Sequence, residues 1–240
     1  MEVKHRLLNF NEKFIYQNTN YFTFSLDSLL LANFVTINLS DKKIIDLATG
    51  NAPIPMLLTN RTKATIYGIE LQKEIYNLGL KSILENKLEK QIIVINENVK
   101  QISNIFESDF FDIVTCNPPY FRINENNNVN DNKIKSIARH EIELNLEDVL
   151  KATKKILKNG GTFAMVHRPE RLVEIIEIMK KYNIEPKRIR FVYPKENRNA
   201  NILLIEGIKN GKPGLKILNP LIVYNQNNEY TSEIRKMFGE

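Results

Sequence analysis

The chain has 240 residues, of which 42% are hydrophobic, so it can bury the core of one α/β domain and is unlike disordered or fibrous proteins. Apolar runs such as residues 29–32 and 92–95 are far shorter than the roughly 18 residues of a membrane helix, and no signal core follows Met1. We therefore expect a soluble, cytoplasmic protein. A single cysteine, Cys116, and 3 histidines argue against a metal site built from cysteine and histidine ligands.

The charge is moderately basic. The chain has 34 basic and 28 acidic residues, a formal charge of +6, which favours a polyanionic partner such as nucleic acid. Lysine, asparagine and isoleucine are all frequent, as in chains encoded by AT-rich genomes. The charge alone is therefore weak evidence for RNA binding.

Strand-length apolar runs alternate with stretches of helical period from residue 43 to residue 206, which is typical of a mainly parallel sheet. In chain order we predict a helix over 25–35, a strand over 43–47, a helix over 52–60, a strand over 65–69, a helix over 72–86, a strand over 92–95, a helix over 99–106, a strand over 111–115, a helix over 145–158, a strand over 162–166, a helix over 170–182, and strands over 188–192 and 202–206. Lys158 followed by Gly160 and Gly161 predicts a helix end, and Pro169 predicts the next helix start. Residues 122–138 are rich in asparagine and predict a mobile surface loop.

The motif with the clearest chemistry is Asn117-Pro118-Pro119-Tyr120, which follows a predicted strand at its carboxyl end, where open parallel sheets build their sites. An exocyclic adenine amine is a poor nucleophile because its lone pair is delocalised into the ring. Two acceptors for its N–H groups would help it attack a methyl sulfonium, and the Asn117 side-chain carbonyl and the Pro118 backbone carbonyl can supply them. The prolines fix φ, and Tyr120 offers a flat face for stacking the base. The alternative is a plain proline turn.

Three further strand ends carry polar residues suited to a nucleotide-like cofactor. Gly50 lets the backbone approach a ligand closely, and Asp46 can hold an ammonium group. Glu70, 24 positions after Asp46, is placed to accept from both hydroxyls of a ribose, and Asn98 can read an adenine edge. The loop lacks the later glycines of a G-x-G-x-x-G fingerprint, which argues against a nicotinamide dinucleotide.

As an ordered set, these residues resemble the class I S-adenosylmethionine-dependent methyltransferases, and more narrowly the bacterial tRNA (adenine-37-N6)-methyltransferases that act on valine tRNA. The resemblance covers nearly the whole chain and also rests on residues 24–30, 139–141, 219–221 and 229–231. It implies an α/β, Rossmann-like class I methyltransferase fold, a seven-stranded, mostly parallel sheet with helices on both faces. It also implies a catalytic domain over 43–240, with the mobile loop at 122–138, and an N-terminal segment over 1–42 whose helix caps the cofactor site.

The resemblance assigns roles to individual residues. Those at the target base are Asn117, Pro118, Pro119 and Tyr120. Those in the S-adenosylmethionine pocket are Ser25, Asp27, Asp46, Ala48, Gly50, Asn51, Glu70, Leu71, Asn98, Val99 and Asn117. The chain departs from the family at Ala48 and Ala52, where glycine is usual, and at Asn98, where aspartate is usual. Because alanine disfavours positive φ, we expect lower cofactor affinity or a shifted loop.

The partner implied by the resemblance is tRNA, through its anticodon stem-loop, with no metal and no membrane. An anticodon-loop purine is already unpaired, so extruding it costs less than flipping a base from a duplex. The basic residues that we predict to contact RNA are Arg122, Lys133, Lys135, Arg139, His140, Lys187, Arg188, Arg190, Lys195 and Arg198. The sequence does not indicate the oligomeric state.

Two alternatives stay open. Asn-Pro-Pro-Tyr serves any planar amine, so a glutamine N5 protein methyltransferase is one, although those enzymes carry a longer helical domain before the cofactor domain than the 42 residues that precede the first strand here. The other is a catalytically silent RNA-binding fold whose Ala48 and Ala52 have closed the cofactor pocket. The intact motif from Asn117 to Tyr120 argues against the second alternative.

Overall fold

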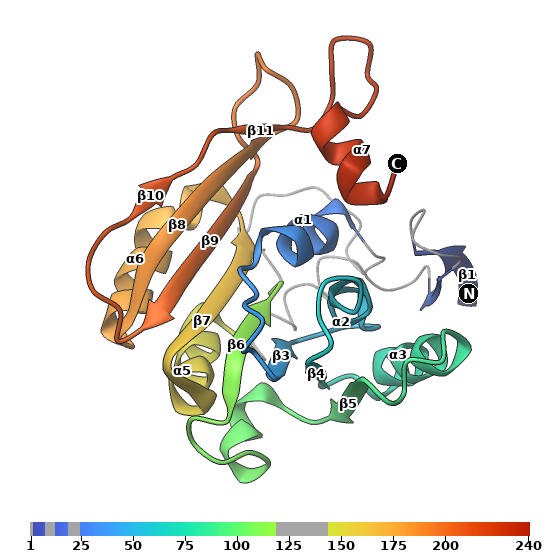
Figure 1. Ribbon diagram of the computed structural model, residues 1–240, viewed down its shortest axis with the longest axis vertical. Coiled ribbons are helices and arrows are strands. Elements are labelled where there is room, and N and C mark those ends of the chain that lie inside the picture. Colours follow the sequence, from blue (N-terminus) through green and yellow to red (C-terminus); the bar gives the residue numbers. More distant parts are fainter. Residues whose placement is uncertain (1, 8–12, 19–24, 119–143) are drawn as a thin grey trace, which may run out of the picture.

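The computed structural model of the chain describes residues 2–7, 13–18, 25–118 and 144–240. One sheet runs through its centre in the order β10-β8-β9-β7-β6-β3-β4-β5, and β11 also pairs with β8 (Figure 1). The strands are β3 (Lys43–Leu47), β4 (Thr65–Glu70), β5 (Ile92–Asn96), β6 (Phe111–Cys116), β7 (Leu157–His167), β8 (Ile184–Tyr193), β9 (Ile202–Lys209), β10 (Lys216–Ile217) and β11 (Leu221–Ile222).

The seven predicted strands are present, and all neighbouring pairs are parallel except those that β9 makes with β7 and β8. The sheet nevertheless has nine strands, because β10 and β11 extend it. Each of these two has only two residues, which is too short to leave a pattern in the sequence. The predicted α/β class with a mostly parallel sheet is confirmed.

The helices lie on both faces of the sheet, as predicted. One face carries α1 (Leu26–Phe34), α2 (Pro53–Leu58), α3 (Lys73–Glu85) and α7 (Ser232–Phe238), and the other carries η1 (Val99–Asn104), α5 (Leu146–Ile156), η2 (Pro169–Arg171) and α6 (Leu172–Lys181) (Figure 1). A separate cluster of buried apolar side chains fills each interface. Within the described residues, no helix combines the length and the apolar character needed to cross a membrane.

The predicted end of the fifth helix was wrong. α5 ends at Ile156, and Lys158, Gly160 and Gly161 lie inside β7 rather than in a helix terminus. The ladder between β6 and β7 is irregular here, because Phe111 pairs with Leu157 whereas Ile113 pairs with Thr162. A Cβ on Gly161 would lie 2.9 Å from the Asp112 carbonyl oxygen, so glycine serves close strand packing at this point.

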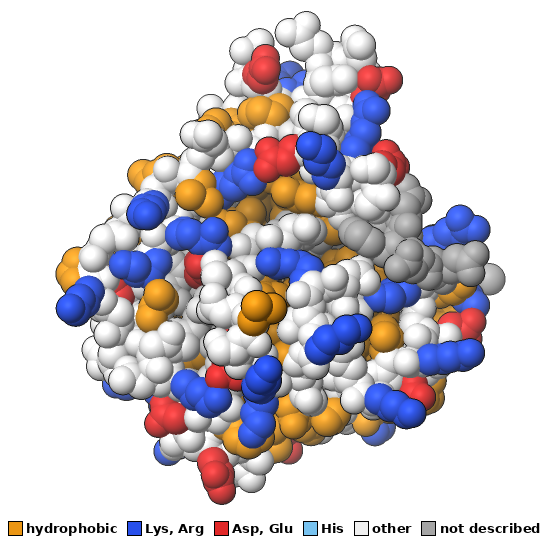
Figure 2. Space-filling view, viewed as in Figure 1, with side chains coloured by type: hydrophobic (Ala, Val, Ile, Leu, Met, Phe, Trp, Pro, Cys, Tyr) orange, Lys and Arg blue, Asp and Glu red, His pale blue; other side chains and the backbone are white. Residues whose placement is uncertain are grey.

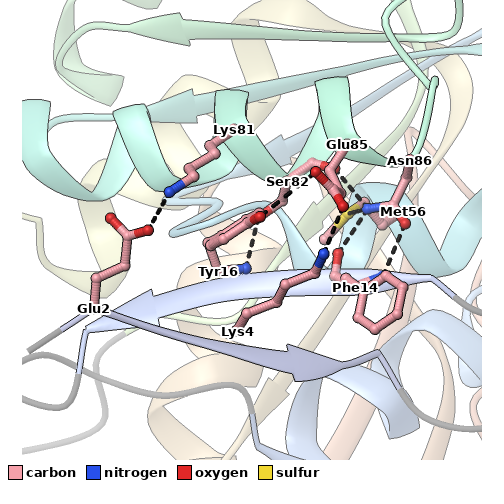
Figure 3. A network of polar contacts seen from close by, with 9 residues as sticks. All are labelled: Glu2, Lys4, Phe14, Tyr16, Met56, Lys81, Ser82, Glu85 and Asn86. Carbon is pink, nitrogen blue, oxygen red and sulfur yellow. Dashed lines mark hydrogen bonds and ion pairs between the residues drawn. The ribbon is translucent and has the colours of Figure 1, made fainter.

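An N-terminal hairpin that the sequence did not predict packs on α3. It consists of β1 (Glu2–Arg6) and β2 (Phe14–Asn18), paired antiparallel. The outer edge of β2 is hydrogen-bonded by side chains instead of another strand (Figure 3). The Phe14 N–H donates to Asn86 Oδ1 at 2.8 Å, Asn86 Nδ2 donates to the Phe14 carbonyl at 2.6 Å, and the Tyr16 N–H donates to Ser82 Oγ at 2.9 Å.

We expect Asn86→Ala to lower the free energy of unfolding by about 2 kcal/mol, because it leaves two backbone groups of Phe14 without their partners. Urea denaturation followed by circular dichroism measures the loss. Lys81→Ala, which removes an exposed ion pair with Glu2 and a cation–π contact with Tyr16 on the same hairpin but no backbone hydrogen bond, is the matched control and should change stability less. Equal effects of the two substitutions would contradict this role for Asn86.

Candidate active site

The predicted site residues that the structure describes converge on one edge of the sheet. β3, β4, β5, β6 and β7 are parallel neighbours, so their carboxyl ends lie side by side. Glu70 pairs with Asn96, and Leu47 pairs with both Ile69 and Cys116. The loop after β3, the end of β4 and the Asn117-Pro118 segment after β6 therefore surround the same space, which is the usual location of ligands in open α/β sheets.

Asp46 is a buried carboxylate at the end of β3, with only 1% of its surface exposed. Its Oδ1 accepts from the Thr115 hydroxyl at 2.6 Å and its Oδ2 from the Thr49 hydroxyl at 2.7 Å. Burial raises the pKa of Asp46 to about 7, the nearby Glu70 raises it further, and the two threonine hydroxyls oppose the shift. A cation or an N–H donor beside this carboxylate would stabilise its charged form.

The loop after Asp46 has an unusual backbone. Ala48, Gly50 and Ala52 have φ values of 53°, 61° and 65°, in the left-handed region that favours glycine. From the sequence we expected that the two alanines could shift the loop, but they adopt the backbone conformation that glycine would take. The left-handed conformation costs roughly 1–2 kcal/mol at each alanine. A Cβ built on Gly50 would meet no atom within 4 Å, so the backbone at this residue faces open space that a ligand can enter.

We expect Ala48→Gly to leave stability unchanged or to raise it by up to about 1 kcal/mol, because relief of left-handed strain offsets the larger entropy of glycine in the unfolded chain. Thermal unfolding monitored by circular dichroism gives the comparison. Ala152→Gly, the same change inside α5, is the control and should cost about 1 kcal/mol or more. If both variants lose stability equally, Ala48 is not strained.

Glu70, at the end of β4, is hydrogen-bonded to the loop that follows β3. Its Oε2 accepts from the Gly50 N–H at 2.9 Å and its Oε1 from the Gln72 N–H at 2.8 Å. Burial raises the pKa of Glu70, while these backbone bonds oppose the shift. Two buried carboxylates, Asp46 and Glu70, thus border a loop with exposed backbone at Gly50, a combination that fits a ligand carrying both a positive charge and hydroxyl groups.

Asn51 does not point its amide into this space. Its side chain is buried, and Nδ2 donates to the Tyr16 carbonyl of the hairpin at 2.7 Å. The loop is therefore tied to the N-terminal hairpin through Asn51. Contact of this side chain with a cofactor remains a prediction.

The start of the Asn-Pro-Pro-Tyr motif lies beside α1. The Asn117 Nδ2 is 3.4 Å from the Ser28 hydroxyl, and Pro118 is buried. Pro119 and Tyr120 lie outside the described residues, as do the whole of 122–138 and the predicted RNA contacts Arg122, Lys133, Lys135, Arg139 and His140.

The structure also describes the remaining predicted cofactor residues, and each has its own structural environment. Asn98 caps η1, with Oδ1 accepting from the Lys100 N–H at 2.9 Å, and Val99 is buried as the first residue of η1. Leu71 is 41% exposed beside Glu70. Ser25 has the backbone of a helix N-cap without a side-chain capping bond, and Asp27 lies in the first turn of α1.

The basic residues near β8 separate into two groups. Arg188 makes an ion pair at 2.9 Å with the buried Glu206, and Arg190 makes one at 2.7 Å with Glu233, so both stabilise the fold. Lys187 donates to the Lys212 carbonyl, away from the site. By contrast, Lys195 and Arg198 lie in the turn between β8 and β9, at the sheet edge where β7 ends, because Val192 pairs with Ile202. RNA contact by any of these residues stays a prediction.

Sequence reasoning missed the groups that surround the predicted ones. The hydroxyls of Thr49 and Thr115 define the environment of Asp46. His167, the last residue of β7, is buried at the same edge, and its Nδ1 accepts from the Arg168 N–H at 2.7 Å. Burial, assisted by Arg171, lowers the pKa of His167 to about 4, so its imidazole is neutral at pH 7. Its position at a strand end was the signal that could have found it.

A family model described as RNA methyltransferase matches residues 14–182. Similar curated proteins include the tRNA1(Val) (adenine(37)-N6)-methyltransferase of Bacteroides fragilis (strain YCH46), 24% identical over 214 residues that cover 88% of this chain and 89% of that protein. The protein of the same name from Parabacteroides distasonis is 27% identical over 165 residues, which cover 69% of this chain and 68% of that protein.

Solved structures share the fold. A predicted O-methyltransferase from Agrobacterium tumefaciens has a TM-score of 0.72 at 21% identity, covering 89% of this chain and 95% of that one. TrmK of M. capricolum in complex with S-adenosyl-homocysteine has a TM-score of 0.54 at 18% identity, covering 82% and 72% of the two chains. The fold is thus that of the class I S-adenosylmethionine-dependent methyltransferases. Because the family model spans most of its length, the chain belongs to the RNA methyltransferase family.

Proposed function

We propose that the protein transfers a methyl group from S-adenosylmethionine to the exocyclic N6 of an adenosine in tRNA, at position 37 beside the anticodon. The observation that carries this proposal is the juxtaposition of Asn117-Pro118, at the end of β6, with Asp46 and the left-handed loop at the end of β3. The reaction is also the one named for the relatives from Bacteroides fragilis and Parabacteroides distasonis.

The residues present fit the cofactor. Asp46 and Glu70 are suited to its ammonium group and its ribose hydroxyls, and the open backbone at Gly50 allows close approach. When bound, S-adenosylmethionine supplies an electrophilic methyl group on a sulfonium. Leu71, Asn98 and Val99, at the ends of β4 and β5, are placed to border the adenosine end, and Ser25 and Asp27, at the start of α1, the methionine end.

The chain's own contribution to the chemistry is to orient the amine. The Asn117 side-chain carbonyl and the Pro118 backbone carbonyl accept the two N–H bonds of N6, which turns the nitrogen lone pair toward the methyl carbon. With S-adenosylmethionine bound, its methyl carbon would bond to this nitrogen as its bond to sulfur breaks, leaving S-adenosylhomocysteine. The extra proton would then leave the methylated nitrogen for water, which needs no strong base. We propose Pro119 and Tyr120 as the further residues at the target base, with Tyr120 stacking on it.

We also propose that residues 1–42 form a segment that covers the cofactor site and that 43–240 form the methyltransferase domain. Two contacts support this division: Asn51 of the loop donates to the Tyr16 carbonyl, and Asn117 lies beside Ser28 of α1. The anticodon stem-loop is the proposed partner, with Lys195 and Arg198, in the turn between β8 and β9, as predicted contacts at the site edge. A tRNA substrate implies a cytoplasmic protein.

The catalytically silent alternative is disfavoured by the loop itself. Ala48 and Ala52 adopt left-handed backbone, so their methyl groups have not redirected the chain away from the path that glycine would take. Nothing in the described residues specifically favours the glutamine N5 alternative, which becomes an outcome of the test.

Methyl transfer from labelled S-adenosylmethionine to total tRNA, protein extract and DNA, offered in parallel, tests the proposal. We expect label in tRNA, recovered as N6-methyladenosine after nuclease digestion. A valine tRNA transcript with adenosine at position 37 should accept methyl, and the same transcript with guanosine there should not. Label in protein would instead support glutamine methylation, and no label from a protein that still binds tRNA would support the silent fold.

A further inference from the structure

A groove of about 650 Å³ lies on the face of the molecule that carries η1 and α5. The two helices pack side by side (Figure 1), and α5 runs from the site edge of the sheet toward the opposite edge because it connects the end of β6 to the start of β7. Lys100 lines the groove two residues after Asn98, so one end opens beside the predicted cofactor site. The groove therefore leads away from the active site along the length of α5.

The lining of this groove is basic. It includes five lysines, Lys100, Lys151, Lys154, Lys155 and Lys209, against the two acidic residues Asp109 and Asp148. Elsewhere, on the face shown in Figure 2, basic side chains are scattered and interspersed with acidic ones. The groove thus combines a hollow shape with a surplus of positive charge.

The ion pairs within the groove leave one set of lysines available. Lys209 Nζ contacts Asp109 at 2.8 Å and the carbonyls of Lys154 and Leu157, each at 2.7 Å, and Lys100 contacts Asp148 at 3.1 Å. These contacts occupy both aspartates. Within the described ranges, the Nζ atoms of Lys151, Lys154 and Lys155 take part in no ion pair.

These three lysines form a group on the exposed side of α5. Lys151 precedes Lys154 and Lys155 by about one helical turn, so the three are neighbours on the helix face that borders the groove. Glu147, one turn before Lys151, is held by Lys181 and by the Tyr182 hydroxyl at 2.8 Å. Across the groove, Ser103 and Ser108 offer hydroxyl groups. Three ammonium groups and two hydroxyls that line one groove suit the phosphates of a nucleic-acid backbone.

We propose that this groove binds the sugar–phosphate backbone of the substrate RNA where that backbone leads away from the active site along α5, with Lys151, Lys154 and Lys155 as the phosphate contacts. The proposal rests on the proposed function, because an RNA whose adenosine lies at Asn117 has its backbone at the sheet edge where the groove opens. These contacts would set affinity and register without reading sequence.

The test is a triple variant, Lys151→Gln, Lys154→Gln and Lys155→Gln, compared with wild type. Binding of unmodified tRNA is measured by filter retention between 50 and 200 mM salt, roughly the range in which phosphate contacts dominate the salt dependence. We expect the slope of log K against log salt to become shallower by about 2, since each lost phosphate contact contributes roughly 0.7–0.9. We also expect KM for tRNA to rise about tenfold, with kcat and the Kd for S-adenosylmethionine unchanged.

The matched control replaces Lys63, Lys87 and Lys90 by glutamine. These lysines are exposed, precede β4 and β5 and do not line the groove, and their loss changes the net charge equally. An equal fall in slope for both variants, or an unchanged slope for the groove variant, overturns the proposal. A third outcome would also overturn it: pyrophosphate inhibits wild type but not the groove variant, while the slope of log K for tRNA against log salt is the same in both. That result would assign the groove to a small anion. The salt dependence of tRNA binding can be measured without any methyl transfer. A failure of this proposal can therefore be distinguished from a failure of the proposed function.

Discussion

Asn117→Ala is expected to lower kcat for tRNA methylation by about 10²- to 10³-fold, because it removes one of the two acceptors that orient the attacking amine. Binding of S-adenosylmethionine and KM for tRNA should change by no more than about threefold, since the acceptor acts mainly as the nitrogen becomes tetrahedral. Steady-state rates with saturating tRNA, together with calorimetric titration of the cofactor, separate these quantities.

The matched control for this prediction is Ser28→Ala. It removes the hydroxyl that lies 3.4 Å from Asn117 Nδ2 but leaves the acceptor oxygen in place, so kcat should fall by no more than about tenfold. Asn117→Asp retains an acceptor oxygen and should recover part of the activity lost in the alanine variant. A loss confined to KM would show that Asn117 holds RNA instead of orienting the amine.

Asp46→Asn is expected to raise the stability of the protein at pH 8 while weakening its binding of S-adenosylmethionine. The folded-state pKa of Asp46 is raised from its ordinary 3.8 to about 7, mainly by burial. Between these two pH values the folded state therefore binds more protons than the unfolded state, and wild-type stability falls as the pH rises through that window. Above pH 7 the loss of folding free energy caused by ionising the buried Asp46 is complete, on the order of 4 kcal/mol. Asparagine does not ionise, so the variant avoids this loss.

Urea unfolding of wild type and Asp46→Asn at several pH values from 5 to 8 measures this difference, which should grow as the pH rises and level off above about pH 7. Asp112→Asn is the opposing control. Burial works against a lowered pKa for Asp112, but bonds from Lys158 and from the Lys42 and Lys43 N–H groups lower it below 3.8. Its loss should destabilise the protein equally at every pH in this range. If the difference in the free energy of unfolding between Asp46→Asn and wild type did not change with pH, the Asp46 carboxylate would be charged in the folded protein at little cost.

The central strands were predictable because both faces of the sheet are covered. Ile44, Ile45, Ile113 and Val114 are all buried, so strands of a few residues stand out as continuous apolar runs. The hairpin was not predictable in this way. β1 reads Glu-Val-Lys-His-Arg and has no apolar run, and β2 is held by Ser82 and Asn86, which lie 66 and 72 residues away from Tyr16 and Phe14. Only the folded chain brings those partners together.

In the candidate site, too, some roles could be predicted from the sequence and others could not. Asp46, Glu70 and Asn117 could be predicted because each follows a strand, and strand ends in a parallel sheet share one edge. The roles of Arg188 and Arg190 could not, because their acidic partners are 18 and 43 residues distant. Nor could the sequence alone distinguish Lys187 from Arg198. Lys187 lies near the start of β8, whereas Arg198 lies in the turn after β8, at the sheet edge where β7 ends.

The side chains that bond the outer edge of β2 also bear on self-association. A strand whose N–H and carbonyl groups are unpaired is a template for strands of other molecules, and most proteins cover such an edge with backbone or repel partners with charge. Here Asn86 and Ser82 occupy the donors and acceptors of Phe14 and Tyr16, while Asn51 occupies the Tyr16 carbonyl. The same three side chains that attach the hairpin thus keep β2 from joining an intermolecular sheet, so attachment and protection from aggregation are properties of one set of contacts.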